Sequence, residues 1–111
     1  MIQPEQIAEI LAQYQRHGWT LRRVLLSDSL RVHITSELPA LFSGAEIVSS
    51  GVDAVWFSRP TKNGEAWELR HLSETPFALF ELFDDKTNAA DLRARLVEME
   101  NRLKSRVLIS R

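Results

Sequence analysis

The chain has 111 residues and a nearly balanced charge, since 14 lysines and arginines against 15 aspartates and glutamates leave a net charge of -1. Its 44% hydrophobic content, four glycines and four prolines are typical of one folded domain, residues 1–111, and exclude a disordered or linker-rich chain. It contains no cysteine, which excludes disulfides, thiolate nucleophiles and cysteine-bound metals.

The N-terminal part of the chain predicts a helix followed by a strand. Pro4 suits the first turn of a helix. The apolar residues after it recur at helical spacing: Ile7, Ile10, Leu11 and Tyr14. His17 and Gly18 end this helix, because glycine readily adopts the left-handed conformation that follows a helix C-terminus. Residues 19–26 are rich in β-formers and predict the first strand.

Residues 27–44 predict a second helical region that contains a proline. Ser27 is a suitable N-cap for it. Pro39 removes one helical hydrogen bond and clashes with the preceding turn. The region is therefore either one kinked helix or two helices, with Ser36 capping the second, and it ends at Gly44.

Residues 46–73 alternate β-prone runs with turn signals. Gly51 interrupts the first run, so that residues 52–59 form the better strand. Asn63–Gly64 between two strand-like runs predicts a two-residue turn, and residues 66–73 form the returning strand.

The predicted turn fixes which residues of the two strands face each other. Arg59 lies opposite Glu68 in this register, and Trp56 lies opposite His71. One face of the pair then carries Trp56, Ser58, Trp67, Leu69 and His71. We expect this face to point to the core, because tryptophan has a large apolar body.

The opposite face has a mixed composition: Val55, Phe57, Arg59, Glu68, Arg70 and Leu72. A solvated sheet face with stabilising cross-strand pairs is the favoured interpretation. The alternative is a binding surface formed by Phe57, Arg59, Glu68 and Arg70, since interfaces are enriched in arginine and aromatic residues.

Residues 77–83 predict a fourth strand rather than a helix, because the run is short, aromatic and ends at two aspartates. One side of this strand carries Phe77, Leu79, Glu81 and Phe83, and the other carries Ala78, Phe80 and Leu82. Both sides are therefore apolar, and helices on one face of the sheet would cover only one of them.

The C-terminal part predicts a long helix that begins near Asn88. Three acid-to-base pairs stand four residues apart on it: Asp91 and Arg95, Glu98 and Arg102, Glu100 and Lys104. The apolar tail from Val107 to Ser110 is either a short added strand or a segment ordered by a partner. The element order α-β-α-β-β-β-α predicts an α+β fold, with an antiparallel sheet of about four strands and helices mainly on one face.

No motif in the sequence indicates catalysis, a metal or a cofactor. The four glycines are isolated, so there is no phosphate-binding loop. The order of Asp53 and Glu68 is faintly similar to the carboxylate pair of metal-dependent nucleases, but Arg70 stands where their lysine would be. The predicted register also separates these two carboxylates by about 20 Å, too far to share an ion. We therefore expect no catalytic residues, metal or cofactor.

These patterns lead to an expected function class. The balanced charge lacks the concentrated basic field of a nucleic-acid-binding protein, and no apolar run is long enough to cross a membrane. The chain is expected to be a cytoplasmic, non-catalytic protein-interaction domain, with another protein or a second copy as its partner. A ligand-binding or enzymatic domain that uses Arg59, Glu68, Arg70 and His71 is the alternative.

A homodimer is the slightly favoured form of this association. Its interface would use Phe77, Leu79 and Phe83 on the fourth strand, whose edge also offers unpaired backbone groups. In the competing arrangement, the last helix or the tail covers the second face of that strand within the same chain.

Overall fold

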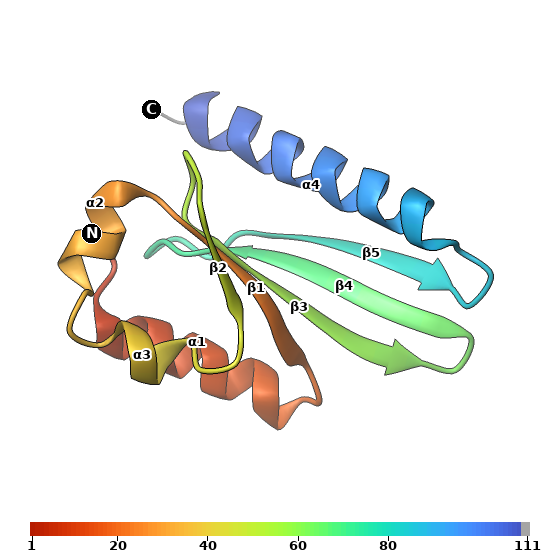
Figure 1. Cartoon of the computed structure of the whole chain (residues 1–111), viewed down its shortest axis with the longest axis horizontal. Helices are drawn as coiled ribbons and strands as arrows, with labels where there is room; N and C mark the ends of the chain where they lie inside the picture. Colours follow the sequence, from red (N-terminus) through yellow and green to blue (C-terminus); the bar gives the residue numbers. More distant parts are fainter. Residues whose placement is uncertain (110–111) are drawn as a thin grey trace.

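The computed structural model describes residues 1–109 and shows a five-stranded sheet between two helical layers (Figure 1). The sheet order is β2-β1-β3-β4-β5. Its strands are β1 (Thr20–Leu26), β2 (Glu46–Ser49), β3 (Ala54–Thr61), β4 (Gly64–His71) and β5 (Ala78–Asp84). Only β1 and β2 pair in parallel, and the other neighbours are antiparallel. The α+β prediction is confirmed, with β2 as one strand more than the four that the sequence indicated.

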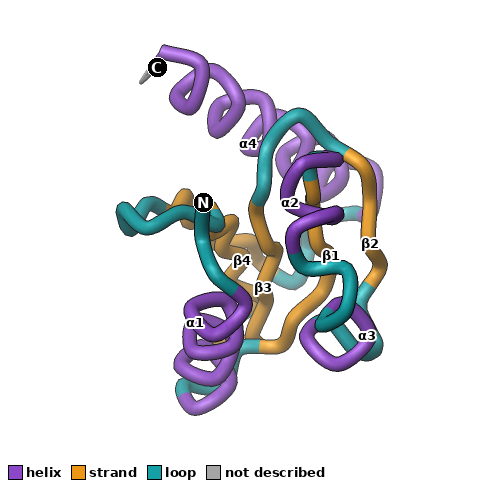
Figure 2. Tube along the Cα trace, turned by 90° about the vertical axis from the view of Figure 1, so that its left-hand side faces the viewer, coloured by secondary structure: helices purple, strands orange, loops and turns teal. Residues whose placement is uncertain are grey.

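Of the four helices within residues 1–109, three lie on one face of the sheet, in agreement with the prediction (Figure 2). They are α1 (Pro4–Arg16), α2 (Asp28–His33) and α3 (Leu38–Leu41). The Ser27 hydroxyl caps α2 by accepting a hydrogen bond from the Leu30 amide at 3.2 Å. Pro39 lies in the first turn of α3, which shows that the region forms two helices. The N-cap of α3 is Glu37, so the prediction of Ser36 as its cap was wrong.

This helical face encloses the first of two cores. Its buried members include Ile7 of α1, Leu30 of α2, and Val24, Val55 and Phe57 of the sheet. These side chains are almost fully excluded from solvent. Among the described residues, this core contains more buried apolar side chains than the second core.

The fourth helix, α4 (Ala89–Ile109), covers the other face of the sheet (Figures 1 and 2). Met99 and Leu103 of α4 pack on Trp56, Trp67 and Leu69, which form the core face that the sequence predicted. The Asn88 side chain accepts a hydrogen bond from the Asp91 amide at 2.8 Å and so caps the helix. Since α4 continues to Ile109, the tail is not an added strand up to that residue, and Ser110 lies outside the described residues.

Two charged side chains of α4 reach the sheet, and within residues 1–109 none of the three predicted acid-to-base pairs along the helix forms. Arg95 pairs with Glu81 of β5 and with Glu98, three residues further along α4. Glu100 accepts a hydrogen bond from the Trp56 indole at 2.7 Å and lies 3.8 Å from a guanidinium nitrogen of Arg23. These contacts tie the helix to three strands of the sheet.

The register of β3 and β4 corrects the predicted turn. Thr61 faces Gly64, so the connecting residues are Lys62 and Asn63 rather than Asn63 and Gly64. Phe57 lies opposite Glu68 and Trp56 opposite Leu69, which means that the predicted pairs Arg59–Glu68 and Trp56–His71 were wrong. The shift is two residues, and it therefore leaves each side chain on the face where it was predicted.

Gly64 explains why the predicted turn fails. It does not have a positive φ, and so does not act as a left-handed turn residue. A Cβ atom on Gly64 would lie 1.9 Å from the carbonyl oxygen of Phe83, because β5 approaches the backbone there. Gly64 is required for close strand packing, a role that local turn statistics do not reveal.

Candidate functional site

The outermost strand β5 is the strand predicted for residues 77–83, and it is exposed along one edge of the sheet. Its side chains alternate between a covered and an open side. Leu79 and Phe83 pack toward α4 and belong to the second core. Phe80 and Leu82 point to the opposite side, where they are 51% and 63% exposed.

The backbone of β5 alternates in the same way. The Phe77 carbonyl accepts from the His71 amide at 2.9 Å, and the Asp85 amide donates to the Asn63 carbonyl at 2.8 Å. Odd-numbered positions of the strand therefore turn their backbone groups toward β4. The amides and carbonyls of Phe80 and Leu82 consequently face the open edge, and within residues 1–109 no backbone group pairs with them.

Trp19 extends the exposed apolar surface away from the edge. Its ring meets the Phe80 ring edge-on, with 6.4 Å between the centroids. We call Trp19, Phe80 and Leu82 the edge patch. The Arg59 guanidinium lies 4.7 Å from the centre of the Trp19 ring and donates to the His17 carbonyl at 2.9 Å, so it borders the patch.

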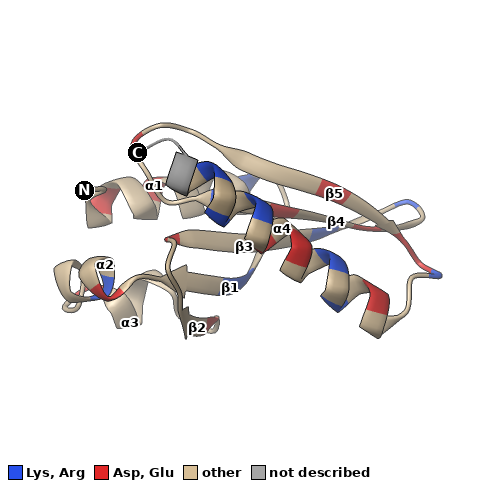
Figure 3. Cartoon of the chain, turned by 90° about the horizontal axis from the view of Figure 1, so that it is seen from above, with Lys and Arg blue, Asp and Glu red and all other residues tan. Residues whose placement is uncertain are grey.

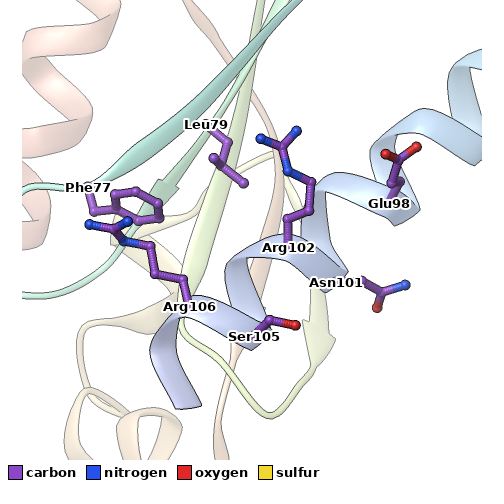
Figure 4. A pocket seen from close by; sticks show the side chains of 7 residues that line it. All are labelled: Phe77, Leu79, Glu98, Asn101, Arg102, Ser105 and Arg106. Atoms are coloured by element: carbon purple, nitrogen blue, oxygen red, sulfur yellow. The ribbon is translucent and has the colours of Figure 1, made fainter. Parts of the chain in front are cut away.

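An open groove of about 720 Å³ runs along the other side of β5, between the strand and α4 (Figure 4). Phe77 and Leu79 form its apolar wall, while Arg102 and Arg106 lean toward them from the helix. The Arg106 guanidinium lies 4.1 Å from the centre of the Phe77 ring. No carboxylate among the described residues forms an ion pair with Arg102.

Charge is unevenly distributed around this groove. The C-terminal half of α4 is predominantly basic, whereas β5 carries only acidic charges (Figure 3). The acidic residues of the strand are Glu81 and Asp84. The exposed edge therefore presents carboxylates beside a basic helix.

The three residues predicted for a dimer interface lie on the covered side of β5. Phe77, Leu79 and Phe83 are half-buried against α4. The competing arrangement, in which the last helix covers one side of the strand, is thus present in the fold. The exposed side belongs to Phe80 and Leu82, which were correctly predicted to share one face. The sequence did not indicate that this face is the open one.

Two of the predicted binding residues, Phe57 and Glu68, are held beneath α1. Phe57 is fully buried and stacks on Tyr14, with the ring centroids 4.0 Å apart. The Tyr14 hydroxyl donates a hydrogen bond to the Glu68 carboxylate. The pKa of Tyr14 is raised well above its ordinary value, mainly by burial and also by this carboxylate. Phe57 is therefore unavailable to a ligand at the surface.

The other two predicted binding residues point in different directions. Arg59 is exposed beside Trp19 at the end of α1. Arg70 donates to the His71 carbonyl and lies along a small hollow beside α1. Because His71 points to the other face of the sheet, Arg59, Arg70 and His71 do not converge on one cavity.

Asp53 has a structural partner rather than a second carboxylate. It accepts hydrogen bonds from the Ser27 amide at 2.6 Å and from the Ser27 hydroxyl at 3.1 Å, and so links the start of β3 to the start of α2. Within residues 1–109, no cluster of three or more histidine, aspartate or glutamate side chains could hold a metal ion. No helix of the same part of the chain is long and apolar enough to cross a membrane.

His71 should make the stability of the protein depend on pH. Partial burial lowers its pKa below the ordinary value, and nearby Arg70 lowers it further, while Asp53 acts in the opposite direction. The unfolded chain then binds a proton more readily, so the free energy of unfolding falls as pH drops below about 6.5 toward the folded pKa. Urea unfolding at pH 7.5 and 5.5 should show a smaller loss for His71→Gln than for the wild type.

The exposed His33 provides the control for this measurement. His33→Gln should keep the full loss of stability between the two pH values. An equal loss in the wild type and in His71→Gln would show that His71 does not contribute to it.

Comparison with known proteins adds no assignment to this geometry: no protein-family model, curated protein or solved structure matches the chain.

Proposed function

We propose that the protein is a non-catalytic, self-associating domain, in which β5 of one copy pairs with β5 of another. Phe80 and Leu82 carry this proposal, because each exposes an apolar side chain and unpaired backbone groups at the same edge. A strand edge of this kind binds a further strand through main-chain hydrogen bonds, while its side chains provide specificity.

The composition of β5 supports this proposal. Proteins that avoid edge pairing place lysine or proline on the outer strand, or interrupt it with a bulge. The seven residues of β5 contain neither lysine nor proline, and the strand pairs regularly with β4 from Ala78 to Asp84. The edge therefore lacks these protections against another strand.

The alternative of a ligand-binding or enzymatic site has less support. It would require Arg59, Glu68, Arg70 and His71 to act together. Glu68 is bound to Tyr14, and His71 lies across the sheet from the two arginines. The surface at β5 brings its exposed groups together without such a rearrangement.

A proline at position 82 tests the proposal directly. The Leu82 amide faces the open edge, so Leu82→Pro removes a donor for strand pairing without removing a hydrogen bond to β4. Sedimentation equilibrium at tens of micromolar should give the mass of two chains for the wild type. The proline variant should give the mass of one chain.

Leu82→Thr is the matched control, because it also removes the leucine side chain but keeps the amide. We expect it to retain more association than Leu82→Pro, with the same circular dichroism spectrum. A wild-type mass of one chain that stays unchanged on concentration would refute self-association.

A further inference from the structure

We infer that the two copies pair about a two-fold axis at Phe80, and that Arg102 of each copy binds Glu81 of the other. This inference rests on the self-association proposed above and specifies its register. Three observations lead to it: the direction of the backbone groups of β5, the position of its one central charge, and a basic side chain, Arg102, that has no acidic partner among the described residues.

The backbone restricts the possible registers. Two β5 strands that meet edge to edge around a two-fold axis are antiparallel, and they keep equivalent faces on the same side of the joined sheet. The outward-facing groups belong to even-numbered residues, so these must face each other across the seam. If at least five of the seven residues of β5 pair in each copy, the axis passes through Phe80, Glu81 or Leu82.

Charge and apolar contact distinguish these three registers. An axis at Glu81 places two carboxylates directly opposite each other, which is destabilising. An axis at Leu82 places Phe80 opposite Asp84 of the second copy. An axis at Phe80 pairs the two phenylalanine rings and brings Leu82 opposite Ala78, so that apolar residues meet across the exposed face.

The register centred on Phe80 also gives Arg102 an acidic partner at the groove, on the α4 side of β5. There Leu79 lies opposite Glu81 of the second copy. Leu79 is the residue toward which the unpaired Arg102 leans (Figure 4). Each Glu81 would then lie between Arg95 of its own chain and Arg102 of the other. Arg102 is thus the second cation beside the Glu81 carboxylate of the other copy.

The absence of native cysteine makes this register directly measurable, since a single introduced cysteine can form a disulfide only between copies. In the proposed register the two Cα atoms at position 80 are about 5.5 Å apart, within the range of a disulfide. Those at position 82 are separated by about 13 Å along the strands. Under mild oxidation, Phe80→Cys should form a covalent dimer in high yield, and Glu81→Cys and Leu82→Cys should not.

A cysteine at the exposed Val32 measures random collision between copies and should remain largely monomeric on denaturing gels. A covalent dimer of Glu81→Cys or Leu82→Cys in preference to Phe80→Cys would overturn the register while self-association stands. A wild-type chain that sediments as a monomer would instead refute the proposed function itself.

Charge reversal tests the contact of Arg102. Arg102→Glu should weaken the dimer about tenfold or more, because it places like charges together at both symmetry-related contacts. Combining it with Glu81→Arg should recover part of that loss. Arg93→Glu changes the net charge equally at an exposed position near the start of α4 and should have little effect. Equal weakening by Arg93→Glu and Arg102→Glu would overturn the assigned contact.

Discussion

Gly64→Ala should destabilise the protein by about 3 kcal/mol, at the upper end of the usual cost of overpacking. The new Cβ atom would lie 1.9 Å from the Phe83 carbonyl oxygen and 2.7 Å from the Asp84 Cα atom. Both are backbone atoms, so the clash can be relieved only by moving β5 away from β4. Urea unfolding followed by circular dichroism measures this loss.

Gly51→Ala is the matched control for the clash. Apart from the neighbouring residues in the chain, no atom of residues 1–109 lies within 4 Å of a Cβ built on Gly51, and its φ is not positive. The change should alter the free energy of unfolding by less than about 1 kcal/mol. If both variants were equally stable, the close approach of β5 at Gly64 would be contradicted. All chains should be compared at one concentration, because association adds to stability.

Phe57→Ala should cost about 3–5 kcal/mol, the usual range for removing a buried phenylalanine. The ring is fully buried and stacks on Tyr14, so its removal leaves a cavity between α1 and the sheet. The loss should appear as a lower urea midpoint with an unchanged slope of the transition.

Phe80→Ala is the matched comparison, since it removes the same side chain from the same face of the sheet. Phe80 is 51% exposed, and its loss should change the stability of one chain by about 0.5 kcal/mol or less while weakening the dimer. Equal loss of stability in the two variants would show that the edge patch belongs to the folded core.

Much of the fold could be predicted because its signals are local. Pro4 and Gly18 mark the two ends of α1, and Ser27 and Asn88 cap the helices that follow them. Alternation placed Trp56 and Leu69 on one face of the sheet, where the structure has them. These features depend on neighbours within a few positions along the chain.

The errors in the sheet involve contacts between distant segments. The register of β3 and β4 depends on how β5 approaches Gly64, which no local pattern encodes. β2 was not counted as a separate strand because it is only four residues long and pairs in parallel with β1, across the two intervening helices. Long-range pairings of this kind are set by the packing of the whole sheet.

The candidate site could be predicted in part for the same reason. The sequence identified β5 and its two apolar sides, but not which side α4 covers. Phe57 and Glu68 were placed on a mixed face, which α1 covers through Tyr14. The choice between an open and a covered face is made by helices that are remote in sequence, and it therefore required the structure.

The division of the interior into two cores also has a consequence for biosynthesis. The first core is completed by residues that precede β4 and by Leu72, whereas the second requires α4, which follows all five strands in the chain. Because α4 is the last element to leave the ribosome, a sheet that forms before α4 docks exposes Trp56 and Trp67, and chaperones can bind this surface until the helix closes over it.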